Sequence, residues 1–207
     1  MAETFINVTE GSGKKLHTFD RTIGANSVHD EFVLMGEQPM ADYRCTTGTT
    51  YASAATADSH LVQIMAGASL NVYVRRIRVY QHGVATTVTA ASAQIVRLTS
   101  AGTGGTAFTA APMDLSDSAS GATVMTLPTV KGAEGPSLDQ AEGIFIQTLA
   151  AGTFPNQTFV FDFDFRGSRQ KSLRIGAGVA LGIAVKLRTA VAAATVAIAV
   201  EFSEANF

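Results

Sequence analysis

The sequence contains no tryptophan, one cysteine and few charged side chains. Its 207 residues are 46% hydrophobic and 15% charged, and the formal net charge is −2. So little charge excludes a disordered, solvated chain and a long acidic or basic tail. It also gives no electrostatic reason to expect nucleic acid or an anionic membrane as a partner. The length suits one well-buried domain with an accessory segment, or two small domains.

The shortage of cysteine excludes an intrachain disulfide, so packing or association must stabilise the fold. The one thiol, Cys45, lies in the sequence YRCTT (43–47), which contains no signature of a catalytic nucleophile. Because free cysteine is among the most buried residue types, we expect an inert, partly buried thiol.

A secretion signal and a long apolar run are also lacking. The first five residues, MAETF, show no basic segment followed by an apolar one, so we expect a protein used inside a cell or released by lysis. Lys186 and Arg188 interrupt the most apolar stretch, 176–200, and leave eleven residues, 190–200. A spanning helix needs about twenty. Residues 195–202 alternate between apolar and small or polar side chains, which is typical of a strand.

What the sequence does contain is period-two alternation in short runs rich in Val, Ile, Thr and Phe. Such runs, bounded by Gly, Asn, Ser or Thr, predict strands. Helical signals are weak: 51–58, 190–194 and a Ser-x-x-Gln cap at 137–140 support a turn or two at most. The predicted fold class is all-β, a jelly-roll-like antiparallel sandwich with an extended N-terminal arm. The predicted strands are 61–65, 70–79, 94–99, 143–149, 158–166, 179–189 and 195–202.

Two of these strands have informative patterns. In 70–79 the apolar residues change phase at Arg75-Arg76, which predicts a β-bulge. In 158–166 four phenylalanines share one face, and Asp162, Asp164 and Arg166 share the other. The two carboxylates, about 7 Å apart at Cα, are compatible with a paired acid–base site or a hard-cation site. A strand with an aromatic core face and a solvated charged face explains all of these residues, and we favour that interpretation.

Residues 1–60 differ from the rest because they are poor in core-forming side chains. They predict an N-terminal arm or linker, with a flexible basic turn at 11–15 and isolated edge strands at 16–21 and 29–35. The β-sandwich is then expected over 61–207. Two long excursions within it, 100–111 and 116–135, offer further surface for contacts.

No catalytic constellation is found in the sequence. The four histidines have no His or Cys neighbour at metal-ligand spacing, and no nucleophile elbow or Ser-His-Asp arrangement is present. The glycines at 176–182 lack the strand–turn–helix context of a phosphate-binding loop, so we interpret them as a tight turn between strands. We therefore expect no catalytic site, no cofactor and no metal.

The nearest approach to a binding surface is a patch of arginines and tyrosines at 73–80. Such a patch binds phosphates and stacked bases in nucleic-acid-binding proteins. Because the chain is acidic overall and no second patch reinforces this one, we favour ion pairs with a partner protein. The predicted partner-interface residues are Lys14, Lys15, Arg21, Arg75, Arg76 and Arg78.

Two segments resemble proteins of tailed-bacteriophage particles. The first runs from GKKLHTFDRTIG (13–24) to VHDEFVL (28–34) and resembles an N-terminal pattern of virion proteins in which two short strands precede a β-domain. The second runs from GAGVALGI (176–183) to VAIAVEF (196–202) and is similar to the last two strands of small jelly-roll-like phage particle proteins. The high apolar content agrees, since association would cover the surplus apolar surface.

The resemblance implies a non-enzymatic virion protein, a capsid decoration (cement) subunit that binds and stabilises the phage head. Its implied partners are the major capsid protein and copies of itself in a homotrimer. Its implied location is the capsid surface, after assembly in the host cytoplasm. A tail-fibre or adaptor subunit is one alternative, although stalk repeats and heptads are absent. A carbohydrate-binding β-sandwich module is another, weakened by the lack of tryptophan.

Overall fold

The computed structural model describes residues 18–23, 26–31, 40–47, 51–82, 85, 88–145, 159–166 and 173–205. The chain divides into two compact units, Met1–Pro39 and Met40–Phe207. In the first unit, β1 (Thr18–Ile23) and β2 (Asn26–Glu31) pair in antiparallel fashion. The two strands predicted here as isolated edges are therefore partners of each other.

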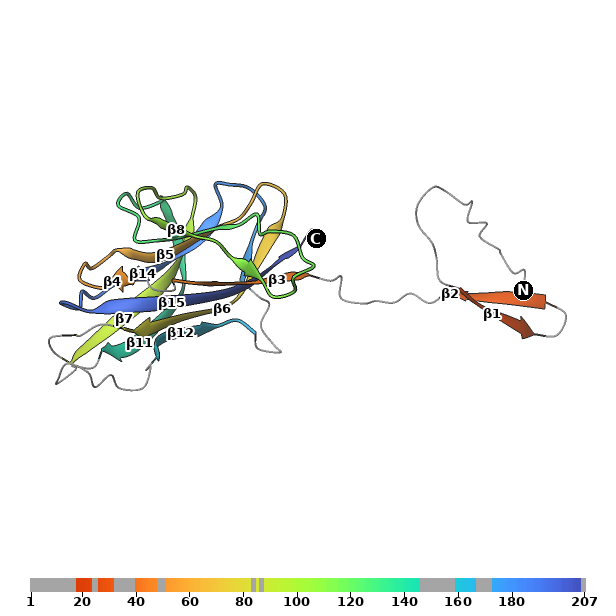
Figure 1. The fold of residues 1–207 in the computed structure, drawn as a ribbon, viewed down its shortest axis with the longest axis horizontal. Coiled ribbons are helices and arrows are strands. Elements are labelled where there is room, and N and C mark those ends of the chain that lie inside the picture. The colour runs from red at the N-terminus through yellow and green to blue at the C-terminus, as the bar shows by residue number, and fades with distance from the viewer. Residues whose placement is uncertain are drawn as a thin grey trace. The chain divides into compact units, whose positions relative to one another are not determined.

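The second unit is an all-β sandwich of two antiparallel sheets (Figure 1). The first sheet has the order β12-β6-β15-β3, and the second sheet has the order β11-β7-β14-β5. The bounds of these strands are β3 (Ala41–Thr46), β5 (His60–Met65), β6 (Asn71–Gln81), β7 (Thr89–Leu98), β11 (Glu134–Phe145), β12 (Phe159–Asp164), β14 (Gly182–Leu187) and β15 (Thr195–Ala205).

The order of these strands is that of a jelly roll. Counted along the chain, the first sheet holds strands six, three, eight and one, and the second sheet holds strands five, four, seven and two. Two interleaved Greek keys of this kind define the jelly-roll sandwich. The predicted fold class is confirmed.

Short strands extend both sheets. In the first, β9 (Ala111–Pro112) pairs with β3, β4 (Ala52–Ser53) with β15, and β13 (Leu173–Ile175) with β6. In the second, β10 (Thr123–Thr126) pairs with β5, and β8 (Thr106–Phe108) pairs with β10. The described residues form no helix, and thus none long and apolar enough to cross a membrane.

The cap predicted at 137–140 lies inside β11, where hydrogen bonds to β7 hold the backbone extended. The ladder bonds of the sheet replace the local cap there. The strand predicted at 143–149 is the end of β11, and its last four residues lie outside the described part of the chain.

The core lies between the two sheets and follows the predicted alternation. On β12, Phe161 and Phe163 are 1% and 2% exposed, and Phe161 meets Phe145 of β11 edge to face with ring centroids 6.2 Å apart. Asp162, between these two phenylalanines, and Asp164, directly after Phe163, are exposed. The interpretation of this strand as one aromatic core face and one solvated charged face is confirmed over 161–164, whereas Val160, predicted on the solvated face, is 4% exposed.

The bulge predicted at Arg75-Arg76 is present. Opposite β6, Glu201 of β15 lies across from Arg76, whereas the next residue, Phe202, lies across from Val74. Arg75 is the extra residue, so both arginines point away from the core while Val74 and Ile77 stay buried.

The sandwich begins at Met40 rather than after residue 60. Sequence analysis assigned 41–60 to the arm, but β3 and β4 pair with β15. The alternation of β3 is short, with Tyr43 and Cys45 buried in the core and the small side chain of Ala41 packed against it. The hydrogen-bonded ladder to β15, which sequence analysis does not reveal, places this segment in the first sheet.

Parts of the two predicted excursions fold onto their own domain. The backbone N–H of Gly102 donates to Gln63 Oε1 on β5 at 2.8 Å, and Thr103 and Val130 exchange backbone hydrogen bonds of 2.9 and 3.1 Å. Segments 99–105 and 129–134 therefore lie together against the second sheet. These segments are held in place by contacts within the chain, although most of their residues remain exposed.

A buried carboxylate on β15 binds another part of the second predicted excursion, 116–135. Glu204 on β15 is 3% exposed and accepts hydrogen bonds from Ser120 Oγ (3.0 Å) and from the backbone N–H groups of Gly121 (3.1 Å) and Ala122 (2.7 Å). The carboxylate itself is buried, so a side chain that cannot accept all three hydrogen bonds leaves an unsatisfied polar contact at Glu204.

Replacing Glu204 with glutamine is expected to lower the free energy of unfolding by about 1–3 kcal/mol, because an amide NH2 then faces a backbone N–H donor. Chemical denaturation with circular dichroism measures the loss. Glu201→Gln, a partly exposed glutamate on the same strand, is the matched control and should cost less than about 1 kcal/mol. Equal losses in both variants would show that Glu204 does not fasten the excursion.

Candidate functional site

The outer face of the first sheet, formed by the side chains that point away from the core, gathers the arginines that sequence analysis selected. Strand register places opposite charges beside one another across four strands. One central row consists of Arg44, Glu201, Arg76 and Asp164. The row beside it consists of Thr46, Ala199, Arg78 and Asp162. Opposite charges in neighbouring strands support the sheet.

Arg76 is the centre of this face. Its Nε donates to Asp162 Oδ1 at 2.8 Å, a second nitrogen pairs with the other oxygen of Asp162, and Asp164 Oδ2 lies 3.7 Å from Nε. The hydrogen bond to Asp162 raises the pKa of Arg76 above its ordinary value. This two-point contact fixes the plane of the guanidinium across β6 and β12.

Arg166 folds back onto Asp164. Its Nη2 and Nε donate to the two carboxylate oxygens at 2.7 and 3.0 Å, and its backbone N–H donates at 2.9 Å. These hydrogen bonds, with the side-chain bond the strongest contribution, hold the pKa of Asp164 well below its usual range. The face therefore keeps this carboxylate charged under mildly acidic conditions.

The remaining two arginines are also engaged within the chain. Arg78 forms an ion pair with Glu201, and Arg75 lies 3.1 Å from Asp42 while its Nε donates to Ser203 Oγ at 2.6 Å. Partly exposed pairs of this kind contribute about 0–1 kcal/mol each. Their main effect is to hold the side chains flat in one arrangement.

The structure thus brings Arg75, Arg76 and Arg78 together but gives each an acidic partner from its own chain. The carboxylates at 162 and 164 are likewise bound by arginines and do not face each other as a free pair. Lys14 and Lys15 lie outside the described residues, and Arg21 is described only as a backbone position in β1.

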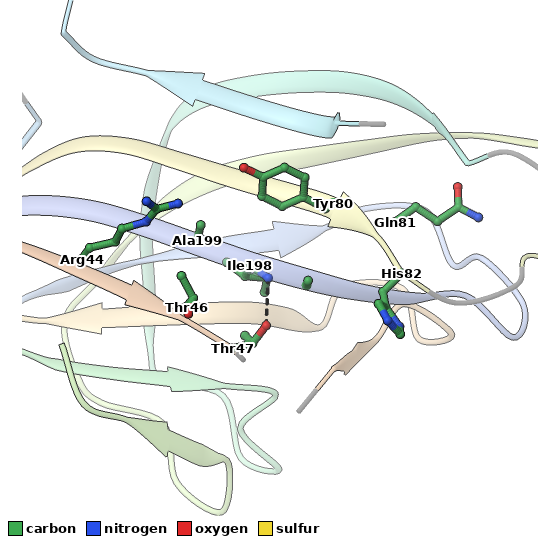
Figure 2. Close-up of a pocket in the computed structure, with 9 residues that line it drawn as sticks. Arg44, Thr46, Thr47, Tyr80, Gln81, His82, Ile198 and Ala199 are labelled. Carbon is green, nitrogen blue, oxygen red and sulfur yellow. Dashed lines mark hydrogen bonds between the residues drawn. The ribbon is translucent and has the colours of Figure 1, made fainter. Parts of the chain in front are cut away.

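Beside the charged rows lies a shallow depression of about 240 Å³ on the same outer face. Figure 2 shows Arg44 and Thr46 of β3, Tyr80 of β6 and Ala199 of β15 around it. Small side chains form its floor, and no acidic residue lines it. Arg44 is exposed at its rim, which makes this end of the face cationic.

Sequence analysis missed Arg44. The signal was present in the alternation of 42–46, where Tyr43 and Cys45 are buried and the residues between them point outward. The segment was too short, and too isolated from other apolar runs, to be recognised as a strand.

The histidines at 60 and 82 and the cysteine at 45 make packing or hydrogen-bond contacts within the chain or are buried. The ring of His82 stacks on Tyr51 with centroids 3.4 Å apart, and His60 is buried beside Glu134. Cys45 is 3% exposed, and burial raises the pKa of its thiol to about 11. The predicted burial of this thiol is confirmed. No group of three His, Cys, Asp or Glu able to hold a metal ion occurs among the described residues.

Comparison of the chain with protein-family models, with curated proteins and with solved structures finds no match.

Proposed function

We propose that this chain is a non-enzymatic structural subunit of a tailed-bacteriophage particle, a capsid decoration (cement) protein that binds the major capsid protein on the outside of the head. Bound copies stabilise the mature shell by mass action, because they bind that state in preference to its open forms. The sandwich associates with further copies as a homotrimer, and the unit Met1–Pro39 reaches the shell.

The observation that supports this proposal best is the strand order. Segments 176–183 and 196–202, which resemble phage particle proteins in sequence, contribute to β14 and β15. Each of these strands lies between two others at the centre of a jelly-roll sheet. The resemblance therefore covers most of β15 and the turn that leads into β14, and the fold is of the type that the resemblance implies.

In this proposal the outer face of the first sheet makes the contact between copies. Its cationic end, at Arg44, is complementary to a carboxylate, and β11 carries the exposed acids Asp139 and Glu142 at the opposite sheet's edge. A contact between two different surfaces of successive copies closes into a ring when the rotation permits, and three copies suffice. We therefore assign the outer face to the acidic edge strand β11 of a neighbouring copy.

Charge reversal tests this contact. Arg44→Glu is expected to weaken self-association at least about ten-fold, since a like charge then meets Asp139 and Glu142. Glu142→Lys should weaken it similarly, and the double variant should recover part of the loss. Sedimentation velocity over a concentration series measures the association. Ala107→Glu, an exposed position on β8 at the far edge of the second sheet, is the control.

Two results would contradict the assignment: a wild-type chain that stays monomeric throughout the series, or an Arg44→Glu variant that associates like the wild type. The function itself is tested by sedimenting the purified chain with particles that lack it. Saturable binding to heads, with increased resistance of the heads to heat, is the expected result. Particles that neither bind the chain nor gain resistance would overturn the proposal.

A further inference from the structure

The outer face of the second sheet carries a buried polar cluster that the proposed function does not use. On β5, Val62 lies opposite Val185 of β14, but His60 lies opposite the next residue, Lys186, so Leu61 is an extra residue. This irregularity turns His60 and Gln63, three positions apart, to the same face. His60 is 1% exposed, and both side chains lie beneath the excursion that returns from β7 to β11.

Hydrogen bonds through the cluster have one consistent direction. The backbone N–H of Gly102 donates to Gln63 Oε1 at 2.8 Å, which leaves Gln63 Nε2 as the donor toward His60 Nδ1 at 2.7 Å. His60 Nδ1 therefore carries no hydrogen, and Nε2–H donates to Glu134 Oε1 at 3.0 Å. The closed arrangement requires a neutral imidazole in a single tautomer.

Glu134, the carboxylate that contacts the imidazole, is shared with cations. Lys186 of β14 donates to Glu134 Oε2 at 2.7 Å, and Lys131, before β11, lies 3.4 Å from Oε1. Asp58, in the turn before β5, lies 3.6 Å from Lys186 and 2.7 Å from Arg188. Two carboxylates thus already serve three cations, and a protonated His60 adds a fourth.

We propose that this cluster is an acid-sensitive clasp, in which protonation of His60 at Nδ1 releases the segment around Gly102 (99–105) from Gln63 of β5, while β10 stays paired with β5. The new Nδ1–H faces the NH2 group of Gln63. If the Gln63 amide rotates to present its oxygen to Nδ1, its NH2 group then faces the Gly102 N–H. Either arrangement loses a buried hydrogen bond, and the bond from Gly102 is the one that joins the segment 99–105 to Gln63 of β5.

The clasp shares its face of the second sheet with a small apolar cluster. The second sheet has a small cluster on its outer side, separate from the main core, made of Met65, Val96, Leu98 and Ala184. Gln63, Ala184 and Val96 lie in one row across β5, β14 and β7, so the clasp and the cluster share a face.

The pH window follows from the burial of the ring. Burial lowers the pKa of His60 below its ordinary value of 6.5, with the hydrogen bond to Glu134 acting in the opposite direction. Glu134 stays charged: burial raises its pKa, but the hydrogen bonds from Lys186 and His60 outweigh this and lower it to about 2. The open form, with an ordinary imidazole, binds the proton more readily. The closed form therefore loses stability as the pH falls below 6.5 toward the lowered pKa.

Amide exchange of the full-length chain by NMR tests the clasp. Between about pH 7.5 and about pH 5, the protection factor of the Gly102 amide should fall at least ten-fold more than that of Ile64 in β5, in step with titration of His60. His60→Gln mimics the neutral tautomer, since its amide can accept from Gln63 and donate to Glu134, and should remove the pH dependence. His82→Gln, at an exposed histidine, should keep it.

The pH titration of the wild-type chain tests the clasp even if the His60→Gln variant does not fold. Unchanged protection of Gly102 while His60 titrates would overturn the clasp, and so would a folded His60→Gln variant that loses protection as the wild type does. The clasp lies on the second sheet and does not depend on the proposed binding to phage heads.

Discussion

Deletion of residues 1–39 is expected to abolish binding of the chain to phage heads while the sandwich stays folded. The division of the chain at Pro39 supports this, because every strand of the two jelly-roll sheets lies in Met40–Phe207. Removing the first unit takes no strand from either sheet. Under the proposed function the first unit makes the contact with the shell, so its loss removes that contact without a change in the core.

Two measurements on the truncated chain check this result. Thermal unfolding should give a melting temperature within a few degrees of the full-length value, as a loss of less than about 1 kcal/mol implies. Co-sedimentation with heads should fall to background. Retained binding would show that the sandwich alone holds the shell, and a truncated chain that does not fold would show that the first unit belongs to the core.

Replacing Phe161 with alanine is expected to lower the free energy of unfolding by about 3–5 kcal/mol. The ring is 1% exposed and packs against Phe145 between the two sheets, so truncation leaves a cavity that the rigid ladders of β12 and β6 cannot close. Few single substitutions in a domain of this size cost more.

The neighbouring residue provides the control. Asp162→Ala changes the same strand on its solvated face, where Arg76 retains Asp164 as a partner, and should cost about 0–1 kcal/mol. Urea unfolding monitored by circular dichroism compares the two variants. A small loss for Phe161→Ala, or equal losses for both, would mean that β12 does not bury its phenylalanine face.

Much of the sandwich was predictable because its strands alternate clearly. The runs at 61–65, 70–79 and 195–202 correspond to β5, β6 and β15, and the change of phase at Arg75 marked a real bulge. In β6 and β15 branched or aromatic side chains alternate along the strand, and β5 is a short apolar run that is buried at every position, so each pattern is local in the sequence.

The features that were missed depend on residues distant in the sequence. The strand at 41–46 has few core side chains and is held by β15, which follows it at the other end of the domain. The ion pairs of Arg76 join β6 to β12, and the bonds of His60 join β5 to β11 and to the excursion. The alternation within one strand does not indicate which strands become its neighbours in the sheet. The acidic and basic side chains could therefore be identified from the sequence, but their pairing could not.

The central claim, that this chain decorates the phage head, is tested most directly by its copy number in purified particles. Quantitative mass spectrometry against the major capsid protein gives that number. The proposal predicts a fixed ratio of the same order as the capsid subunits, as for a protein that covers the shell. A few copies per particle would assign the chain to the tail or neck, and its absence would contradict the proposal and favour a free binding module.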